Sequence, residues 1–464
     1  MRPTRRTVLT ATAAASAAAL GPAGPAEAAA QGGRPPATAQ HPSRELRALL
    51  KELDPARIEA TVRRLVSFGT RHTLSVQDDP ERGIGAARDW LLAELRSCAA
   101  VSGGRMTAEL QSYVQEPASR IPVATKITNV VATLRGSVTP ERVYVVSGHY
   151  DSRVTDVMNA TSDAPGADDD ASGVAVVLEL ARVMARRRPA STIVFAAVAG
   201  EEQGLYGSTY LAQQLKAAGT DVQGMFTNDI VGSSTADDGT KDRYTIRLFA
   251  EGVPTSETPE QAAIRRSVGG ENDSVTRQLA RFVRDVADND ATGMHVRVIY
   301  RRDRYLRGGD HIPFLERAYP AARFTEPAED FAHQHQDVRV EDGKQYGDLP
   351  QFCDFGFVAR VARVNAAALW TLAQAPGTPK GVKIVTSALT NSTQLVWPRG
   401  TEPDLAGYEV VWRETTAPEW THVIPAGDVT TFEADLSKDN VFFGVRAVNA
   451  QGLRSPVAFP APQS

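Results

Sequence analysis

Strand-like and helix-like segments alternate along the sequence from residue 141 to residue 373. The strand-like apolar runs cover residues 141–151, 191–200, 224–232, 244–252, 295–300 and 321–326. Segments with apolar residues every three or four positions separate them, at about 172–187, after Gly204, at about 272–288, from Asp310 and at 352–373. This alternation predicts an α/β fold, a three-layer sandwich with a mixed, mostly parallel sheet. In such sheets ligands bind where the strands end.

A second region follows a Pro/Gly-rich boundary at residues 374–381. Beyond it, short alternating strands are separated by Gly, Pro, Asn and Asp turns, which predicts a C-terminal β-sandwich. Three stretches of this region are Leu395-Val396-Trp397, Tyr408-Glu409-Val410 and Val445-Arg446-Ala447-Val448. Together they resemble a fibronectin type III domain. We therefore predict an α/β domain at residues 44–375 and a sandwich domain at residues 376–464.

The first 30 residues have the composition of an export signal peptide. A basic start precedes a mildly apolar stretch from Val8 to Leu20 and small residues around Ala26-Glu27-Ala28. The pair Arg5-Arg6 resembles a twin-arginine signal, and an ordinary secretory signal is the alternative. Residues 31–43 are rich in Gly, Pro and Gln, which predicts a disordered linker. We expect a secreted protein without membrane insertion, because no later window reaches about 18 apolar residues.

The charge and the cysteine content of the chain limit the classes of molecule and metal site that we expect. The formal net charge is −4 and 23% of the residues are charged, so nothing favours nucleic acid or an anionic membrane as a partner. The chain has two cysteines, Cys98 and Cys353, which are too few for a disulfide framework or a cysteine-built metal site. A disulfide and two buried thiols both fit their apolar helical contexts.

Acidic and histidine residues gather where the predicted strands end. In chain order they are His149 and Asp151, Asp169, Glu201 and Glu202, Asp229, and His333, His335 and Asp337. Each cluster alone has a structural explanation, since aspartates before a helix cap it and a His-x-Asp pair can close a loop. Their coincidence at successive strand ends favours one shared site.

Imidazole and carboxylate groups are the ligands that zinc takes when thiolates are absent. Two ions about 3.5–4 Å apart need a carboxylate that bridges them, and this carboxylate must lie on a tight loop. Asp169 lies in the small-residue loop GADDDASG, in which two dications would neutralise the clustered charges. Asp168 and Asp170 would orient Asp169 or cap the following helix. The sequence therefore predicts a site for two zinc ions per chain.

The motifs SGHYDS, PGADDDASGVA, AGEEQGLYGS and NDIVG occur in this order along the chain. They resemble the motifs of the secreted co-catalytic dizinc aminopeptidases, leucyl aminopeptidase-like enzymes related to glutamate carboxypeptidase and plasma carboxypeptidase Q. The resemblance covers roughly residues 125–375. It implies one zinc ion on His149 and Asp229, a second on Glu202 and a late histidine, and Asp169 between them. It also implies that Glu201 is the general base and that Asp151 orients His149.

Two details of the resemblance concern late segments. In the family the last histidine lies four residues before an aspartate, which selects His333, four before Asp337; His335 is the alternative. The family's Ser-Asp-His segment is here Gly309-Asp310-His311, without the cysteines that flank it in some relatives. The sequence therefore does not predict the shape of that loop.

The resemblance implies an exported zinc-dependent exopeptidase that acts as a monomer on the N-terminal peptide bond, using a metal-bridged hydroxide and Glu201. The alternatives are a carboxypeptidase or dipeptidase on the same dizinc site, and a non-catalytic binding protein on this fold. An aminopeptidase needs an anchor for the substrate ammonium, and a carboxypeptidase needs an arginine. Candidates of both kinds are Glu326 and Glu329, and Arg301, Arg302, Arg304 and Arg307. The sequence has no G-x-S-x-G motif, which excludes a typical serine hydrolase. It has no H-E-x-x-H motif, which excludes a zincin.

The sandwich domain offers no catalytic residues. We expect it to bind a polymer or a cell surface, or to act as a spacer. On that view, its removal spares the turnover of small peptides.

Overall fold

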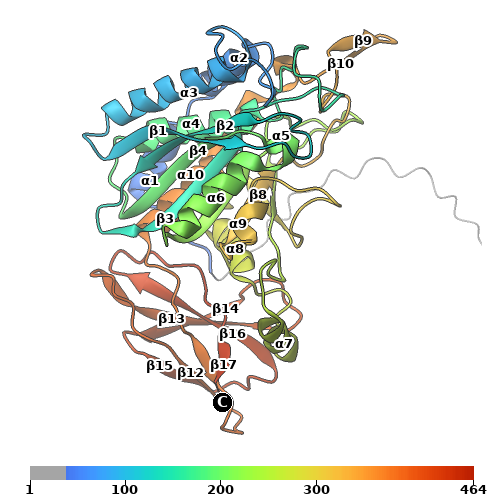
Figure 1. The fold of residues 1–464 in the computed structure, drawn as a ribbon. Helices are drawn as coiled ribbons and strands as arrows, with labels where there is room; N and C mark the ends of the chain where they lie inside the picture. Colours follow the sequence, from blue (N-terminus) through green and yellow to red (C-terminus); the bar gives the residue numbers. More distant parts are fainter. Residues whose placement is uncertain (1–37, 464) are drawn as a thin grey trace, which may run out of the picture. The chain divides into compact units, whose positions relative to one another are not determined.

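The computed structural model describes residues 38–463, and its largest sheet has eight strands in the order β1-β2-β4-β3-β5-β8-β6-β7 (Figure 1). The four central strands β4, β3, β5 and β8 run parallel, and antiparallel pairs join β1 to β2, β2 to β4 and β8 to β6. The strands are Met106–Gln115 (β1), Thr125–Leu134 (β2), Thr139–His149 (β3), Ser191–Val198 (β4), Asp221–Asn228 (β5), Thr245–Phe249 (β6), His295–Ile299 (β7) and Ala321–Thr325 (β8).

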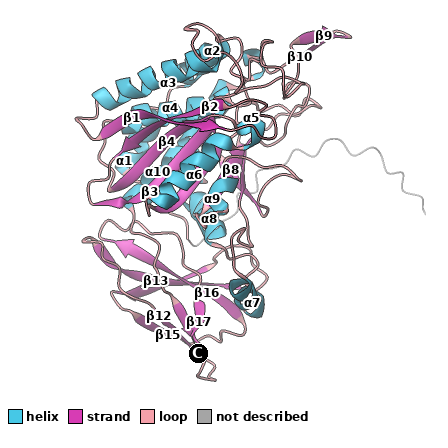
Figure 2. Ribbon diagram, viewed as in Figure 1, coloured by secondary structure: helices cyan, strands magenta, loops and turns pink. Residues whose placement is uncertain are grey.

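Helices cover both faces of this sheet (Figures 1 and 2). One face packs against α3 (Gly83–Ala100), α4 (Ala171–Met184), α8 (Val275–Ala287) and α10 (Phe355–Gln374). Two further helices pack on these helices, α1 (Arg44–Lys51) on α10 and α2 (Pro55–Val66) on α4 and α10. The other face packs against α6 (Tyr206–Ala217) and α9 (Ile312–Leu315). This arrangement confirms the predicted three-layer α/β sandwich with a mixed, mostly parallel sheet.

The central strands are apolar on both sides because both faces are covered. On β3, Val143 and Val145 belong to the core beneath α6 and α9, whereas Tyr144 and Val146 belong to the core beneath α4 and α10. Successive side chains of a strand point to opposite faces, so a strand buried on both sides reads as a continuous apolar run. His149 lies at the carboxyl end of the parallel strands because it is the last residue of β3.

Shorter helices and strands lie in the loops at the carboxyl end of the parallel strands. They are α5 (Glu201–Gly204), the hairpin of β9 (Arg339–Glu341) and β10 (Lys344–Tyr346), and the 3-10 helix η1 (Pro350–Phe352). The helix α7 (Pro259–Ser267) lies instead at the opposite end of the sheet, because it follows β6, which runs antiparallel to β8 (Figure 1). The β9–β10 hairpin projects away from the large sheet in Figure 1.

The C-terminal residues form two smaller, mainly antiparallel sheets that share one apolar core, as predicted for a β-sandwich. Leu395 and Trp397 contribute to this core from one of the two sheets, and Val410, Phe443 and Val445 contribute from the other sheet. The strands are Lys383–Val385 (β11), Thr393–Val396 (β12), Leu405–Glu414 (β13), His422–Gly427 (β14), Thr431–Ala434 (β15), Val441–Asn449 (β16) and Ala461–Gln463 (β17). The likeness to fibronectin type III stays a prediction.

The described chain begins inside the predicted linker at 31–43. Thr38 Oγ1 donates to Asp285 Oδ1 at 2.8 Å, and Gln40 N donates to the Asp285 carbonyl oxygen at 2.8 Å. The last residues of the linker are therefore bound to α8, because Asp285 supplies acceptors that a composition rule does not register. The predicted signal peptide at residues 1–30 lies outside the described residues.

Two further expectations bear on the described residues. Cys98 and Cys353 are both free thiols, so the two-thiol alternative holds and no disulfide joins them. Among residues 38–463, no helix combines the length and the apolar character that a membrane crossing requires.

Candidate metal centre

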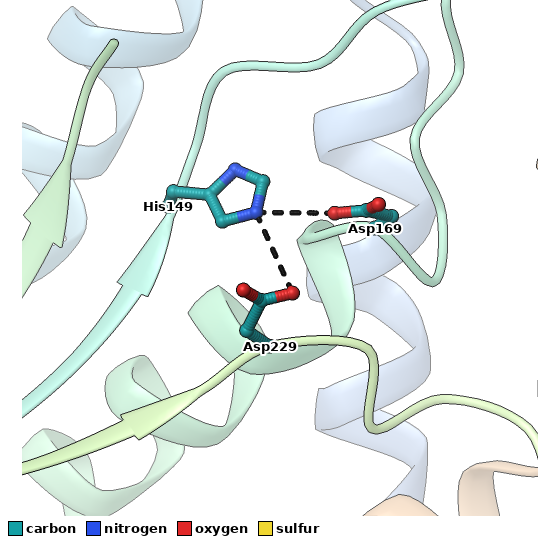
Figure 3. A group of neighbouring side chains, drawn as sticks. All are labelled: His149, Asp169 and Asp229. Atoms are coloured by element: carbon teal, nitrogen blue, oxygen red, sulfur yellow. Dashed lines mark ion pairs between the residues drawn. The ribbon is translucent and has the colours of Figure 1, made fainter. Parts of the chain in front are cut away.

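Two groups of side chains at the carboxyl end of the sheet share one aspartate. His149, Asp169 and Asp229 form the first group, and Asp169, Glu202 and His335 form the second. In the first, His149 Nε2 lies 3.1 Å from Asp169 Oδ1 and 3.8 Å from Asp229 Oδ1 (Figure 3). In the second, His335 Nε2 lies 2.8 Å from Asp169 Oδ2 and 3.0 Å from Glu202 Oε1. Asp169 thus turns one carboxylate oxygen toward each group.

The donor atoms of both groups fit a zinc ion. Within residues 38–463, the buried atoms His149 Nε2, His335 Nε2 and Glu202 Oε1 have no well-directed hydrogen bond. Buried polar atoms are normally paired, so three such atoms gathered around Asp169 indicate a place where a metal ion fits. Zinc ligands about 2.0–2.2 Å from the ion lie about 3.3–3.6 Å from one another in a tetrahedron. The separations of 2.8–3.8 Å around the two histidines bracket that range.

The three adjacent aspartates have three different sets of contacts. Asp169 is the member shared by the two groups. Asp170 is the N-cap of α4, where Oδ1 accepts from Gly173 N at 2.9 Å and Oδ2 accepts from His149 N at 2.9 Å. Asp168 Oδ1 accepts from Gly232 N at 2.6 Å. A Cβ on Gly173 would lie 2.2 Å from the Asn228 carbonyl oxygen, so the start of α4 can approach β5 only with glycine there.

Asp151 connects β3 to the Glu201–Glu202 turn. Its carboxylate accepts from Glu201 N at 3.3 Å, from Glu202 N at 3.1 Å and from Thr73 Oγ1 at 3.0 Å. His149 Nδ1 lies 3.2 Å from the Asp151 carbonyl oxygen and 3.6 Å from its carboxylate. Asp151 therefore fixes the orientation of His149 mainly through its backbone, and its carboxylate fixes the two glutamates.

Glu201 lies beside the two groups but belongs to neither. It begins the short helix α5, and Glu202 on the same turn faces His335. Burial raises the pKa of the Glu201 carboxyl well above its usual value, even though His149 lowers it. Burial also raises the pKa of Asp169, but His335 and His149 outweigh it and hold that pKa well below the ordinary value.

The structure corrects the choice of the late histidine. His333, which the spacing to Asp337 selected, stacks on Phe352 with ring centroids 3.6 Å apart, and its Nδ1 lies 3.3 Å from Asp330. His335 instead faces Asp169 and Glu202. His335 has a φ of 54°, in the left-handed region that few residues other than glycine adopt. Counting along the chain cannot register this turn of the backbone.

We expect His335→Ala to weaken zinc binding by more than about a hundredfold, because losing a residue that merely orients a ligand already costs about 10–100-fold. His333→Ala, two residues away, is the matched control and should bind zinc as the wild type does. Competition with a chromogenic chelator measures both affinities. Equal losses in the two variants, or a larger loss in His333→Ala, would contradict the placement.

Three arginines at the site were missed by the sequence analysis. Arg71, buried, donates to the carbonyl oxygens of Tyr150, Pro165 and Gly166 and so ties the aspartate loop to β3. Arg323 on β8 lies 2.8 Å from Asp229 Oδ1, and Arg153 lies 3.6 Å from Glu202 Oε2. The signal for Arg323 was a charged residue within an apolar strand. Arg71 and Arg153 stand in loops and had no such signal.

Asp348 is a further residue without a sequence signal. Its two carboxylate oxygens accept from the backbone N–H groups of Asp168 and Asp169, each at 2.8 Å. It is buried, and its carbonyl oxygen accepts from Ala167 N at 3.3 Å, so Asp348 holds three consecutive backbone N–H groups of the aspartate loop.

Most of the predicted substrate anchors have partners within the protein. Glu329 accepts from Arg307 at 2.8 Å and from Arg304 at 3.3 Å, and it pairs with Arg247 at 3.3 Å. Glu326 is buried and accepts from Ser233 N at 2.8 Å. Arg301 lies over the ring of Tyr305, and Arg302 is exposed. Neither set stands as a free counter-charge beside Asp169.

The segment Gly309-Asp310-His311 borders the first group. A Cβ on Gly309 would lie 3.3 Å from Asp229 Oδ2, so glycine lets this loop approach the carboxylate. His311 Nε2 lies 2.8 Å from the Arg302 carbonyl oxygen. Asp310 is fully buried, and burial raises the pKa of its carboxyl to about 7.

Residues 129–341 match Peptidase family M28. A protein of Pyrenophora teres f. teres named "Probable zinc metalloprotease" is 58% identical over 425 residues, which are 91% of this chain and 88% of that protein. One of the same name from Leptosphaeria maculans is 58% identical over 421 residues, covering 91% of this chain and 98% of that protein.

Among solved structures, LapA of Legionella pneumophila has the same fold. It superposes with a TM-score of 0.51 at 20% identity, over 71% of this chain and 76% of that chain. At this identity the likeness concerns the fold alone. The identity of more than half the residues over nearly the whole of two relatives is decisive, and the chain belongs to peptidase family M28.

Proposed function

We propose that the protein is an exported, zinc-dependent aminopeptidase that holds two zinc ions at the paired groups. The observation that carries this proposal is the sharing of Asp169 between the two groups. His149 and Asp229 would complete the site of one ion, and Glu202 and His335 the site of the other. Three protein ligands per ion leave a position open for water or substrate, which is the mark of a catalytic zinc site. The names of the two fungal relatives support zinc as the metal.

The chain's own residues divide the work of peptide hydrolysis. When bound, zinc supplies Lewis acidity that lowers the pKa of water and polarises a carbonyl group. Glu201, next to both groups, takes a proton from the attacking water and returns it to the leaving amine. The Asp151 carboxylate holds the backbone of Glu201 and Glu202, so that one side chain serves the proton and the other serves the metal.

Cleavage at the N-terminus is the preferred specificity, with carboxypeptidase and dipeptidase action as the alternatives. A carboxypeptidase needs an arginine for the terminal carboxylate. Arg304 and Arg307 are paired with Glu329, and Arg301 lies over Tyr305, so three of the four predicted arginines are engaged, as is the predicted ammonium anchor Glu329. These pairings favour neither specificity. Export, inferred from Arg5-Arg6 and the apolar stretch after it, fits a scavenging enzyme that acts on varied peptides.

One peptide in three forms separates these specificities. We expect cleavage of the unblocked peptide and of its C-amidated form, and a loss of more than about a hundredfold on N-acetylation, because the free ammonium is the recognised group. A chelator should abolish all cleavage. Loss on amidation with tolerance of acetylation would indicate a carboxypeptidase. Cleavage of unblocked dipeptides alone would indicate a dipeptidase, and failure on every form would favour a binding protein.

A further inference from the structure

The sandwich is joined to the α/β region through buried charges. Asp273, just before α8, pairs through Oδ1 with Arg281 of the same region at 2.8 Å and through Oδ2 with Arg413 of β13 at 2.7 Å. The three side chains are 1–3% exposed. Trp420 Nε1 donates to Gln278 Oε1 of α8 at 2.9 Å. Removing one side of such an interface leaves uncompensated buried charge, so the sandwich is more than a tethered spacer.

One turn of the sandwich, residues 418–420, also holds Tyr300. The Tyr300 hydroxyl donates to Glu419 Oε1 at 2.8 Å and lies 3.1 Å from the Pro418 carbonyl oxygen. Arg281 Nε donates to the same carbonyl at 2.9 Å, and Arg284 pairs with Glu419 at 2.9 Å. The Arg277 guanidinium lies 3.9 Å from the centre of the Tyr300 ring. Tyr300 is thus fixed between α8 and the sandwich.

Tyr300 starts the loop that leads to the metal centre. It follows β7 directly, and the loop from residue 300 to residue 309 ends at Gly309 beside Asp229. Within this loop, the Asp303 carboxylate lies 3.6 Å from Arg323, and the Gly308 carbonyl oxygen accepts from Arg323 at 2.7 Å. Arg323 in turn lies 2.8 Å from Asp229 Oδ1. Side-chain contacts therefore join Glu419 to Tyr300, and Asp303 and Gly308 to Arg323 and Asp229, and the backbone of residues 300–303 links the two sets.

We propose that the sandwich positions the metal centre, with Glu419 and Tyr300 as the positioning residues. By fixing the start of the 300–309 loop, they set where Asp303 and Gly308 hold Arg323, and hence the direction of the Asp229 carboxylate. This inference rests on the proposed function, because it gives Asp229 a zinc ion to hold. It revises the expectation that removal of the sandwich spares the turnover of small peptides.

Four single substitutions in the full-length, zinc-loaded protein test this role. Tyr300→Phe removes the hydroxyl but keeps the ring beneath Arg277, and Glu419→Ala removes the acceptor. Glu419→Gln keeps an oxygen that can accept from Tyr300 and is the conservative rescue. Asp428→Asn is the matched control, because its ion pair with Arg399 lies in the sandwich and is about half exposed, at 47% and 48%.

The readouts are zinc release to a chromogenic chelator, kcat and KM on an unblocked peptide, and the thermal midpoint. We expect Tyr300→Phe and Glu419→Ala to release zinc about five- to tenfold faster and to lose kcat about five- to tenfold, the scale of one ordinary net hydrogen bond. KM and the folded fraction at the assay temperature should stay unchanged, and Glu419→Gln and Asp428→Asn should match the wild type.

Wild-type zinc release and kcat in both Tyr300→Phe and Glu419→Ala would overturn the proposal. So would zinc loss that only followed a fall in the folded fraction. If the wild-type protein holds zinc yet cleaves no peptide, the proposed activity is wrong. The rate of zinc release in the variants then still tests the positioning role. A wild-type protein that takes up no zinc would defeat both.

Discussion

Glu201→Gln is expected to keep zinc and to lower kcat by about 10²–10⁴-fold, because general acid–base groups contribute that much to catalysis. Glutamine has the size of glutamate but cannot take up the proton of the attacking water. Glu201 lies outside both groups of donor atoms, so zinc binding should not depend on its charge. The measurement is kcat on an unblocked peptide together with zinc content by mass spectrometry of the metal.

Glu202→Gln is the matched comparison on the same turn. Glu202 belongs to the second group and faces His335 at 3.0 Å, so this variant should lose zinc as well as activity. The pair of results assigns the two glutamates to different tasks. Normal turnover by Glu201→Gln would remove Glu201 from the proton-transfer role, and zinc loss in that variant would make it a metal ligand.

Asp169→Ala should have a still larger effect, because this residue contributes an oxygen to each group. We expect bound zinc to fall from two ions per chain to about one or fewer, and kcat to fall by more than about 10⁴-fold as the shared carboxylate is lost. Equilibrium dialysis with zinc, followed by metal analysis and a peptide assay, measures both quantities.

The neighbouring Asp168→Asn is the control for this variant. Asp168 accepts from the backbone of Gly232 and is in neither group, so its substitution should leave two zinc ions bound. If Asp168→Asn and Asp169→Ala lost zinc equally, the loop as a whole would matter and the shared ligand would not be Asp169.

Residues that follow apolar strands were predictable from the sequence. His149, Glu202 and Asp229 stand at or just after the ends of β3, β4 and β5, and a parallel sheet brings those ends together whatever the details of packing. Asp169 was recognisable from its small neighbours, which fit a loop that approaches β5 closely. Sequence pattern and fold physics suffice to bring these residues to one end of the sheet, whereas their roles toward zinc stay predictions from the resemblance.

The loop residues were not predictable in the same way. His335 rather than His333 faces Glu202 because the backbone turns into the left-handed region at residue 335, and the spacing to Asp337 carries no information about that turn. Arg71 reaches the aspartate loop from about 95 residues away in the sequence. Such contacts depend on how loops fold over the sheet, which has no periodic signature.

The interface of the sandwich was missed for a related reason. Arg413 lies on β13 and Asp273 precedes α8, 140 residues earlier, and each alone reads as an ordinary surface charge. Only the folded chain shows that they are buried against each other. The strand pattern predicts that the C-terminal region folds as a β-sandwich. It carries no information about which residues of the α/β region the sandwich contacts.

The most direct test of the account is a crystal structure of the zinc-loaded protein with anomalous diffraction at the zinc edge. We expect two zinc peaks about 3.5–4 Å apart. One should contact His149 and Asp229, the other Glu202 and His335, and Asp169 should contact both. A single peak, or two peaks that do not share Asp169, would contradict the account.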